Sequence, residues 1–140
     1  MKGHPPFNSR DSVRRVDNAE WPGYYKSAKE FREKAQGALK KGNYNAAASN
    51  AMHAAINACN AALIFNHGEC SQGRHYDVPD LFGQYFTSPG GTSTKKKLVL
   101  LISRGTEVEK EANNPSPRVA ENMVNMAQEV LGFVARKLPI

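Results

Sequence analysis

The sequence has few cysteines and no long apolar run, and both absences narrow the class of protein. Only two of the 140 residues are cysteine, too few for the disulfide framework of a small secreted domain. No apolar run approaches the ~20 residues that a membrane-spanning helix requires. The first residues, MKGHPPFNSRDSVRRV, contain no apolar core of a signal peptide. We therefore expect a soluble, cytoplasmic protein with no membrane partner.

Charged residues are also missing from one long, alanine-rich stretch. Between Gly42 and Gly68 the sequence contains no Asp, Glu, Lys or Arg. Because a surface helix keeps a charged face, this stretch is typical of the buried central helix of a bundle. Its alanines favour the helical state and allow neighbouring helices to approach closely. Asn43 is expected to cap this helix and Gly68 to end it.

Within this predicted helix, polar and apolar side chains separate onto two faces. At about 100° per residue, one polar stripe contains Ser49, Asn50, His53, Asn57 and Asn60. The apolar side next to it contains Met52, Ile56, Cys59 and Leu63. Amide and imidazole groups in a buried helix need hydrogen-bond partners. The polar stripe is therefore the first candidate for a functional surface.

The other helices are predicted from apolar spacing and from helix-breaking residues. One helix runs from Pro22 to about Lys40, and a short one follows Asp77, its expected cap. Residues 88–91 are predicted to form a turn or loop, after which another helix starts near Thr94. The last helix begins at Ser116-Pro117. Since no segment shows convincing strand alternation, the fold class is all-α, with residues 1–20 as a flexible arm and 21–140 as the helical domain.

Positive charge is in excess and unevenly placed. The net charge is +6, and the segment between Trp21 and Gly42 has six basic residues against two glutamates. Such a face suits an anionic partner such as nucleic acid, a nucleotide or an acidic protein; an ordinary solvated face is the alternative. Lys95, Lys96 and Lys97 are expected in the first turn of the fourth helix, where each opposes the helix dipole by roughly 0.3–1 kcal/mol. A bound anion would relieve this cost, and three solvated lysines are again the alternative.

Three parts of the sequence resemble the small bacterial and archaeal members of the HEPN domain family. Residues 44–49 (YNAAAS), 53–56 (HAAI) and 61–63 (AAL) resemble the second helix of HEPN domains. The loop that contains Gly68, Ser71, Gly73 and His75 resembles the same subgroup, as does a final Ser-Pro-initiated helix rich in Ala, Met and Val. The likeness covers about residues 21–138.

This resemblance implies an up-and-down bundle of four long helices plus one short helix, usually a homodimer. It also implies a place in toxin–antitoxin or other defence systems, often beside a nucleotidyltransferase. Active members are metal-independent ribonucleases in which an Arg and a His, a short spacer apart, lie in a cleft that two protomers share. In this chain Arg104 matches the Arg, but Glu109 stands where the His would be expected.

We therefore expect a non-catalytic binding or regulatory module that holds RNA, a nucleotide or a partner protein in a dimer cleft. The candidate ligand-binding residues are Arg104, Glu107, Glu109, His53, Asn57 and the three lysines 95–97. The ordinary alternative is that Arg104 and Glu107 form an i,i+3 surface pair and that His53 is a satisfied interior imidazole. The functional alternative is a metal-independent endoribonuclease in which His53 or His75 replaces the missing His.

The loop after the central helix also contains groups that can bind metals. His67, Cys70, His75 and Asp77 lie within eleven residues, but their spacing is not that of a zinc site. A polar connecting loop is the favoured interpretation, so neither a metal nor a cofactor is expected. The thiol of Cys59 should be buried and inert, and Cys70 lacks a clear activating arrangement.

Overall fold

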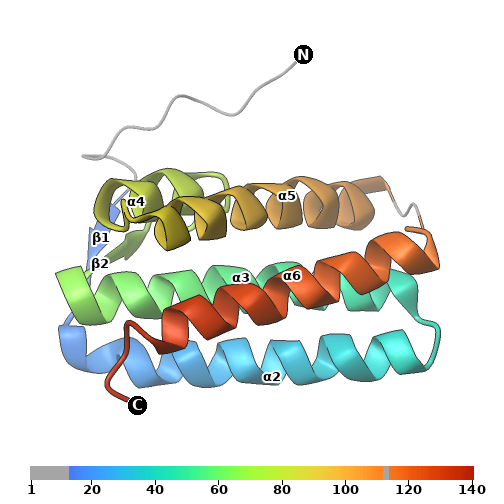
Figure 1. Cartoon of the computed structure of the whole chain (residues 1–140), viewed down its shortest axis with the longest axis horizontal. Helices are drawn as coiled ribbons and strands as arrows, with labels where there is room; N and C mark the ends of the chain where they lie inside the picture. The colour runs from blue at the N-terminus through green and yellow to red at the C-terminus, as the bar shows by residue number, and fades with distance from the viewer. Residues whose placement is uncertain (1–12, 112–113) are drawn as a thin grey trace.

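The computed structural model describes residues 13–111 and 114–140. In chain order the elements are β1 (Val13–Arg15), η1 (Asn18–Glu20), α2 (Trp21–Lys40), α3 (Tyr44–His67), β2 (Glu69–Ser71), α4 (Asp77–Tyr85), α5 (Pro89–Glu111) and α6 (Pro117–Ala135). The four long helices run alternately up and down along the same axis, with the short α4 at one end (Figure 1). The prediction of an all-α bundle of four long helices plus one short helix is confirmed.

The central helix of the bundle is α3, the alanine-rich stretch without charge. It packs against α2, α5 and α6, and the side chains of Met52 and Leu63 are fully buried. The approach of α5 depends on Gly105, where an added Cβ would lie 2.6 Å from the Sδ of Met52. The small residues therefore allow close helix packing, as the sequence indicated. None of the described helices is both long and apolar enough to cross a membrane.

The ends of the helices agree with the sequence in some places and differ in others. Gly68 ends α3 with a φ of 66°, and the Oγ of Ser116 accepts the Val119 N–H at 3.1 Å at the start of α6. Asn43 occupies the cap position of α3 without a side-chain hydrogen bond to the helix. The prediction that Asp77 caps α4 is wrong, because Asp77 is the first residue of the helix. Its buried carboxylate accepts a hydrogen bond from the Nε of Arg74 at 2.8 Å.

Helix α5 begins at Pro89 instead of near Thr94, so the predicted loop at residues 88–91 is wrong. Proline is suited to the first turn of a helix, and the Oγ of Ser88 accepts the Gly91 N–H at 3.1 Å. Gly91 packs closely on the backbone of Phe86, where a Cβ would clash. The glycines of this segment therefore serve close packing.

The earlier start of α5 moves its three lysines out of the first turn. The Nζ of Lys95 lies 3.9 Å from Asp80, and that of Lys97 lies 3.5 Å from Glu129. Because the unfavourable dipole effect falls off beyond the first turn, the electrostatic reason for expecting an anion at these lysines no longer applies.

Residues 13–20, which the sequence analysis assigned to the arm, form β1 and η1; the rest of that arm lies outside the described residues. Strand β1 pairs antiparallel with β2, with Val13 opposite Ser71 and Arg14 opposite Cys70. The side chain of Asn18 continues this attachment by donating to the carbonyl of Ile64 at 2.9 Å. Strands of three residues are too short to show alternation in a sequence. Their pairing places Arg14 beside α3.

Candidate binding site between α3, α5 and the β1–β2 pair

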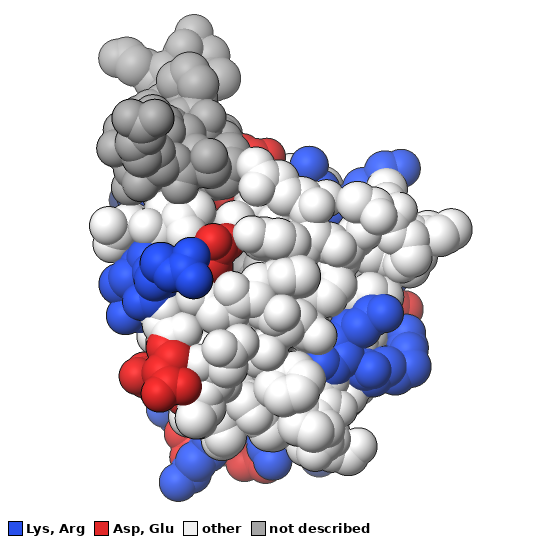
Figure 2. All heavy atoms as spheres, turned by 90° about the vertical axis from the view of Figure 1, so that its left-hand side faces the viewer, with Lys and Arg blue, Asp and Glu red and all other residues white. Residues whose placement is uncertain are grey.

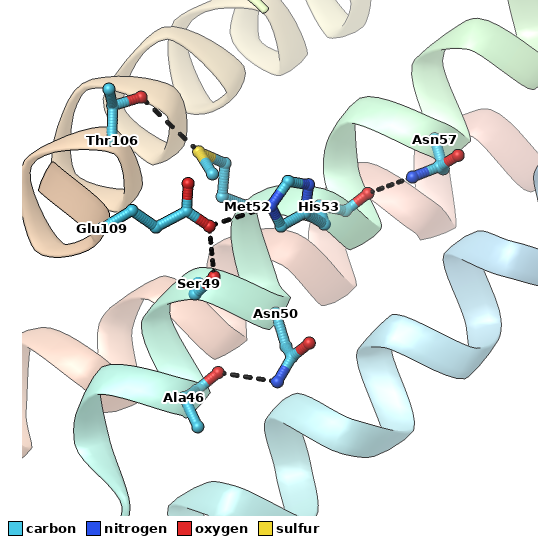
Figure 3. Close-up of polar contacts among 8 residues, drawn as sticks. All are labelled: Ala46, Ser49, Asn50, Met52, His53, Asn57, Thr106 and Glu109. Carbon is cyan, nitrogen blue, oxygen red and sulfur yellow. Dashed lines mark hydrogen bonds and ion pairs between the residues drawn. The ribbon is translucent and has the colours of Figure 1, made fainter.

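One side-chain cluster connects the polar stripe of α3 to α5 (Figure 3). The Nε2 of His53 lies 2.9 Å from the Oε2 of Glu109. One turn earlier on α3, the Oγ of Ser49 donates to the same oxygen at 2.5 Å. The side chains of His53 and Glu109 are 27% and 39% exposed, so a ligand can reach this cluster from solvent.

Two rings flank the imidazole of His53. The ring of His75, from the loop after β2, lies 5.4 Å from it between centroids, nearly perpendicular. The ring of Phe31, from α2, has the same centroid distance of 5.4 Å to His53 and is tilted by 32°. The fold thus brings together the two histidines that the sequence analysis named separately as replacements for a missing His.

The environment of this cluster changes the pKa of two groups. Partial burial would raise the pKa of Glu109, but hydrogen bonds from Ser49 and His53 outweigh burial and hold it below its ordinary value. Burial lowers the pKa of His75, and a positive charge on His53 lowers it further, against a smaller opposing effect of Glu109. At neutral pH the cluster therefore has an ionised Glu109 beside a neutral His75.

A pocket of about 420 Å³ opens next to the two histidines. The other polar side chains of its lining are Arg14, Tyr24, Asn57, Asn60, Ser71 and Gln72. Arg14 is held at this wall because its Nη2 donates to the Tyr24 hydroxyl at 2.7 Å. The sequence analysis did not find Arg14 or Tyr24 as site residues, because only the pairing of β1 with β2 brings them to α3.

Two amides of the α3 stripe form part of this pocket. The Nδ2 of Asn57 donates to the backbone carbonyl of His53 at 2.8 Å. Asn60, one turn further, is only 8% exposed. Among the residues that the structure describes, none offers a hydrogen bond to its buried Oδ1. Such an atom normally has a partner in a folded protein, so the Oδ1 of Asn60 is an exception in the packing behind this pocket.

The comparison with protein families matches this architecture to one family. The family model of the HEPN domain matches residues 22–138. The chain belongs to the HEPN domain family. Comparisons with curated proteins and with solved structures gave no match. Membership of the HEPN family indicates a role connected with nucleotides or RNA, or with a toxin–antitoxin system.

The residues expected from the ribonuclease motif of HEPN proteins are divided between two places. Glu109 joins the α3 stripe. Arg104 and Glu107 instead line a separate pocket of about 290 Å³, together with Val119 and Met123 of α6. Glu109 lies five positions after Arg104, and at about 100° per residue the two side chains point to different sides of α5. The structure of this HEPN chain does not bring Arg104 to His53 and Asn57.

The groups considered for metal binding are also dispersed in the HEPN bundle. The ring of His67 stacks on Tyr85 with centroids 3.7 Å apart, whereas Asp77 bonds to Arg74. Over the described ranges, no cluster of three or more His, Cys, Asp or Glu is arranged to hold a metal ion.

The two thiols of this HEPN chain are poor nucleophiles. Burial raises the pKa of Cys59. It also raises that of Cys70, although Arg14 and Tyr24 act in the opposite direction. Because the thiolate is the reactive form, both cysteines are inert at neutral pH.

Proposed function

We propose that this HEPN protein is a non-catalytic binding or regulatory module of a prokaryotic defence or toxin–antitoxin system, and that it binds RNA or a nucleotide. One observation supports this most: Arg14, His53 and His75 line the same pocket. The planar guanidinium of arginine suits a phosphate group. A neutral imidazole can both donate and accept a hydrogen bond. The pocket therefore combines a fixed positive charge with adaptable polar groups.

Glu109 supports binding without cleavage. Its carboxylate is ionised at neutral pH, since its pKa is lowered, and a negative charge repels a phosphate that approaches His53. We therefore expect the phosphate of the ligand on the Arg14 side of the pocket. There the guanidinium is exposed and donates a hydrogen bond to the Tyr24 hydroxyl.

The charge on one end of the bundle agrees with a local binding site. Figure 2 shows the end where β1, β2 and α4 lie, with Lys and Arg side chains in separate groups and a broad uncharged surface between them. A duplex that lies across this face would meet little continuous positive charge. A single nucleotide, whose charge lies on its phosphate, can be held by one cationic side chain such as Arg14.

The proposal includes a homodimer, formed through the α3 and α5 surfaces, in the cytoplasm. Val99 and Leu100 on α5 support such a contact, because they are apolar and 46% and 45% exposed. A second protein, such as a nucleotidyltransferase, completes the proposed system as the partner that the module regulates.

The test measures binding of fluorescently labelled single-stranded RNA and of nucleotides over a series of salt concentrations. We expect Arg14→Ala to weaken RNA binding by about tenfold or more, as for loss of a charge-assisted hydrogen bond, and to reduce the salt dependence. Arg118→Ala, an exposed arginine at the start of α6, is the matched control and should bind as the parent does.

Two results would contradict the proposed site. If Arg104→Ala weakens binding and Arg14→Ala does not, the ligand lies in the other pocket, against α6. If neither RNA nor any nucleotide binds the parent at micromolar concentrations, the binding function itself is wrong.

A metal-independent endoribonuclease is the second candidate, and the 5.4 Å separation of the His53 and His75 rings favours it. Cleavage of a phosphodiester needs one group that removes a proton and one that supplies a proton. His75, with its lowered pKa, is suited to be the base, and Glu109 orients His53 as the acid.

The ribonuclease assay incubates mixed RNA with the protein and a chelator. Cleavage by the parent that disappears in His53→Ala and in His75→Ala, but persists in Arg118→Ala, would replace the non-catalytic function by this one. RNA that stays intact under conditions where it binds would exclude the second candidate.

A further inference from the structure

We infer that residues 72–76, the loop between β2 and α4, form a pH-sensitive wall of the pocket beside α3: this pocket loop rests on His53 near neutral pH and is released in mild acid. Gln72, Gly73 and His75 of the loop line the pocket. Release of the loop would therefore remove one wall. This pH response goes beyond the proposed function, since it governs access to the pocket whatever molecule binds there.

The pocket loop is fixed at both ends and exposed in its middle. It follows Ser71, the last residue of β2, and precedes the buried Asp77 at the start of α4. Gln72, Gly73 and Arg74 are exposed. Gly73 has a φ of 94°, a conformation that glycine adopts without steric cost. Because residues at the ends of elements commonly act as hinges, the middle of the loop can move while β2 and α4 stay in place.

A ring contact joins the pocket loop to the polar stripe of α3. The half-buried imidazole of His75 lies 5.4 Å from that of His53 between centroids, with the two planes at 79°. Aromatic rings favour this edge-to-face arrangement. The Nε2 of His53 also contacts Glu109 of α5, so two helices hold the ring against which His75 rests. An uncharged His75 therefore closes the loop on a fixed support.

The charges around this contact tolerate one imidazolium but not two. The titratable and charged side chains on the surrounding segments are Tyr24 of α2, His53 of α3, Glu109 of α5, Arg14 of β1, Cys70 of β2, and Arg74 and Asp77 at the end of the loop. Arg74 and Asp77 form an ion pair with each other at 2.8 Å. Glu109 stays ionised in mild acid because its pKa is lowered, and a single carboxylate balances a single imidazolium. Protonation of both His53 and His75 leaves an excess of positive charge at the contact.

The pKa of His75 gives the direction of the pH response. Burial lowers this pKa, a positive charge on His53 lowers it further, and Glu109 opposes them with a smaller effect. In the released loop the ring is hydrated and titrates near its ordinary pKa of 6.5. The closed loop is therefore fully stable above about pH 6.5 and loses stability as the pH falls toward the lowered pKa. Since release takes up one proton, the ratio of released to closed loop rises by at most about tenfold per pH unit.

The experiment follows the parent protein by NMR between about pH 8 and about pH 5, the range in which a histidine titrates. At the upper end we expect a nuclear Overhauser effect between the ring protons of His53 and His75. Its intensity should fall as His75 is protonated, and the amide resonance of Gly73 should shift in step. The apparent pKa of His75 should lie below its ordinary value. The amide of Gly132 in α6 is the internal reference and should stay in place, which separates release of the loop from unfolding of the bundle.

Two variants test whether His75 is the group that responds. His75→Phe keeps an aromatic ring at the contact and removes the proton, so the Gly73 amide should no longer respond to pH in this range. His67→Phe is the matched control. The pKa of His67 is also lowered, chiefly by burial, but its ring stacks on Tyr85 instead. The Gly73 amide of His67→Phe should therefore follow that of the parent.

Each contrary result would overturn the pH-sensitive wall. A ring-to-ring effect that persists after His75 is protonated would show that the charged loop stays closed. A His75 that remains neutral at the acid end would show that the wall is fixed over this range. A Gly73 response that survives in His75→Phe, or disappears in His67→Phe, would assign the titration to another group. None of these results concerns binding at neutral pH, so the proposed function stands or falls separately.

Discussion

The Nε2 of His53 lies 2.9 Å from the Oε2 of Glu109, a contact that joins the middle of α3 to the end of α5 (Figure 3). Glu109 occupies the place on α5 where the resemblance to active HEPN proteins leads one to expect a histidine. In this chain an imidazole nevertheless lies beside position 109. It is the ring of His53 on α3, and the carboxylate of Glu109 on α5 contacts it. With Glu at position 109, the site therefore still contains an imidazole, that of His53.

Replacement of Glu109 by glutamine should make the stability of the protein less dependent on pH in the acid range. The folded protein lowers the pKa of Glu109 below its ordinary value of 4.5. The resulting stabilisation is fully present above the ordinary value and is lost as the pH falls through the lowered one. Because the side chain is 39% exposed, we expect only about 0.2–1 kcal/mol, the range for exposed pairs.

The measurement compares urea unfolding of the parent and of Glu109→Gln between about pH 7 and about pH 3. The parent should be the more stable protein near neutrality, and the difference should shrink in acid. Glu107→Gln removes an exposed carboxylate from the same helix and should follow the parent. Parallel pH profiles for the parent and Glu109→Gln would show that the contact with His53 does not stabilise the fold.

Gly105→Ala should destabilise the bundle, whereas Gly37→Ala should stabilise it slightly. A Cβ on Gly105 would lie 2.6 Å from the Sδ and 2.7 Å from the Cβ of Met52, so α5 must move away from α3. Overpacking of this kind costs about 1–3 kcal/mol. Nothing lies within 4 Å of a Cβ on Gly37, also in a helix, and alanine there gains roughly 0.5–1 kcal/mol. Chemical unfolding should therefore give opposite signs, and equal effects would contradict close α3–α5 packing.

Ile56→Asp should leave the protein largely unfolded. Ile56 is buried on the apolar side of α3, where an unpaired carboxylate costs several kcal/mol or more, against a typical total stability of about 5–15 kcal/mol. Ala46→Asp places the same group at an exposed position of the same helix and should fold. Far-UV circular dichroism on heating distinguishes the two variants. A melt of Ile56→Asp that matches the parent would mean that α3 is not the centre of the core.

The helices of the bundle could be predicted because their signals are local. The uncharged stretch, the left-handed Gly68 and the cap at Ser116 each act within a few residues, and all three agree with the structure. The start of α5 was missed because Pro89 and two glycines resemble a loop. In the structure they form a first turn that packs on Phe86, so a tertiary contact decides the conformation.

The site was only partly predictable, for a related reason. Helical spacing predicted the stripe with His53 and Asn57, and the family motif pointed to Glu109. In the structure Glu109 contacts His53, and Asn57 follows His53 along the stripe of α3. Arg14 reaches the pocket through strand pairing between residues far apart in the chain. Three-residue strands give no periodic signal, so sequence spacing alone had no means of placing Arg14 in the site.

The last prediction concerns the homodimer. Val99 and Leu100 are adjacent, apolar and about half exposed on α5, and exposed apolar residues next to each other are a common feature of protein interfaces. Light scattering at micromolar concentration should give roughly twice the mass of the chain, as for the common two-fold dimer.

A variant with Val99→Glu and Leu100→Glu should have the mass of a single chain, because the two carboxylates would repel their copies across the contact. Gln128→Glu, an exposed change on α6, is the control that should stay dimeric. A parent that is monomeric over this range would remove the shared cleft, and each chain would then have to bind its ligand with the α3 pocket alone.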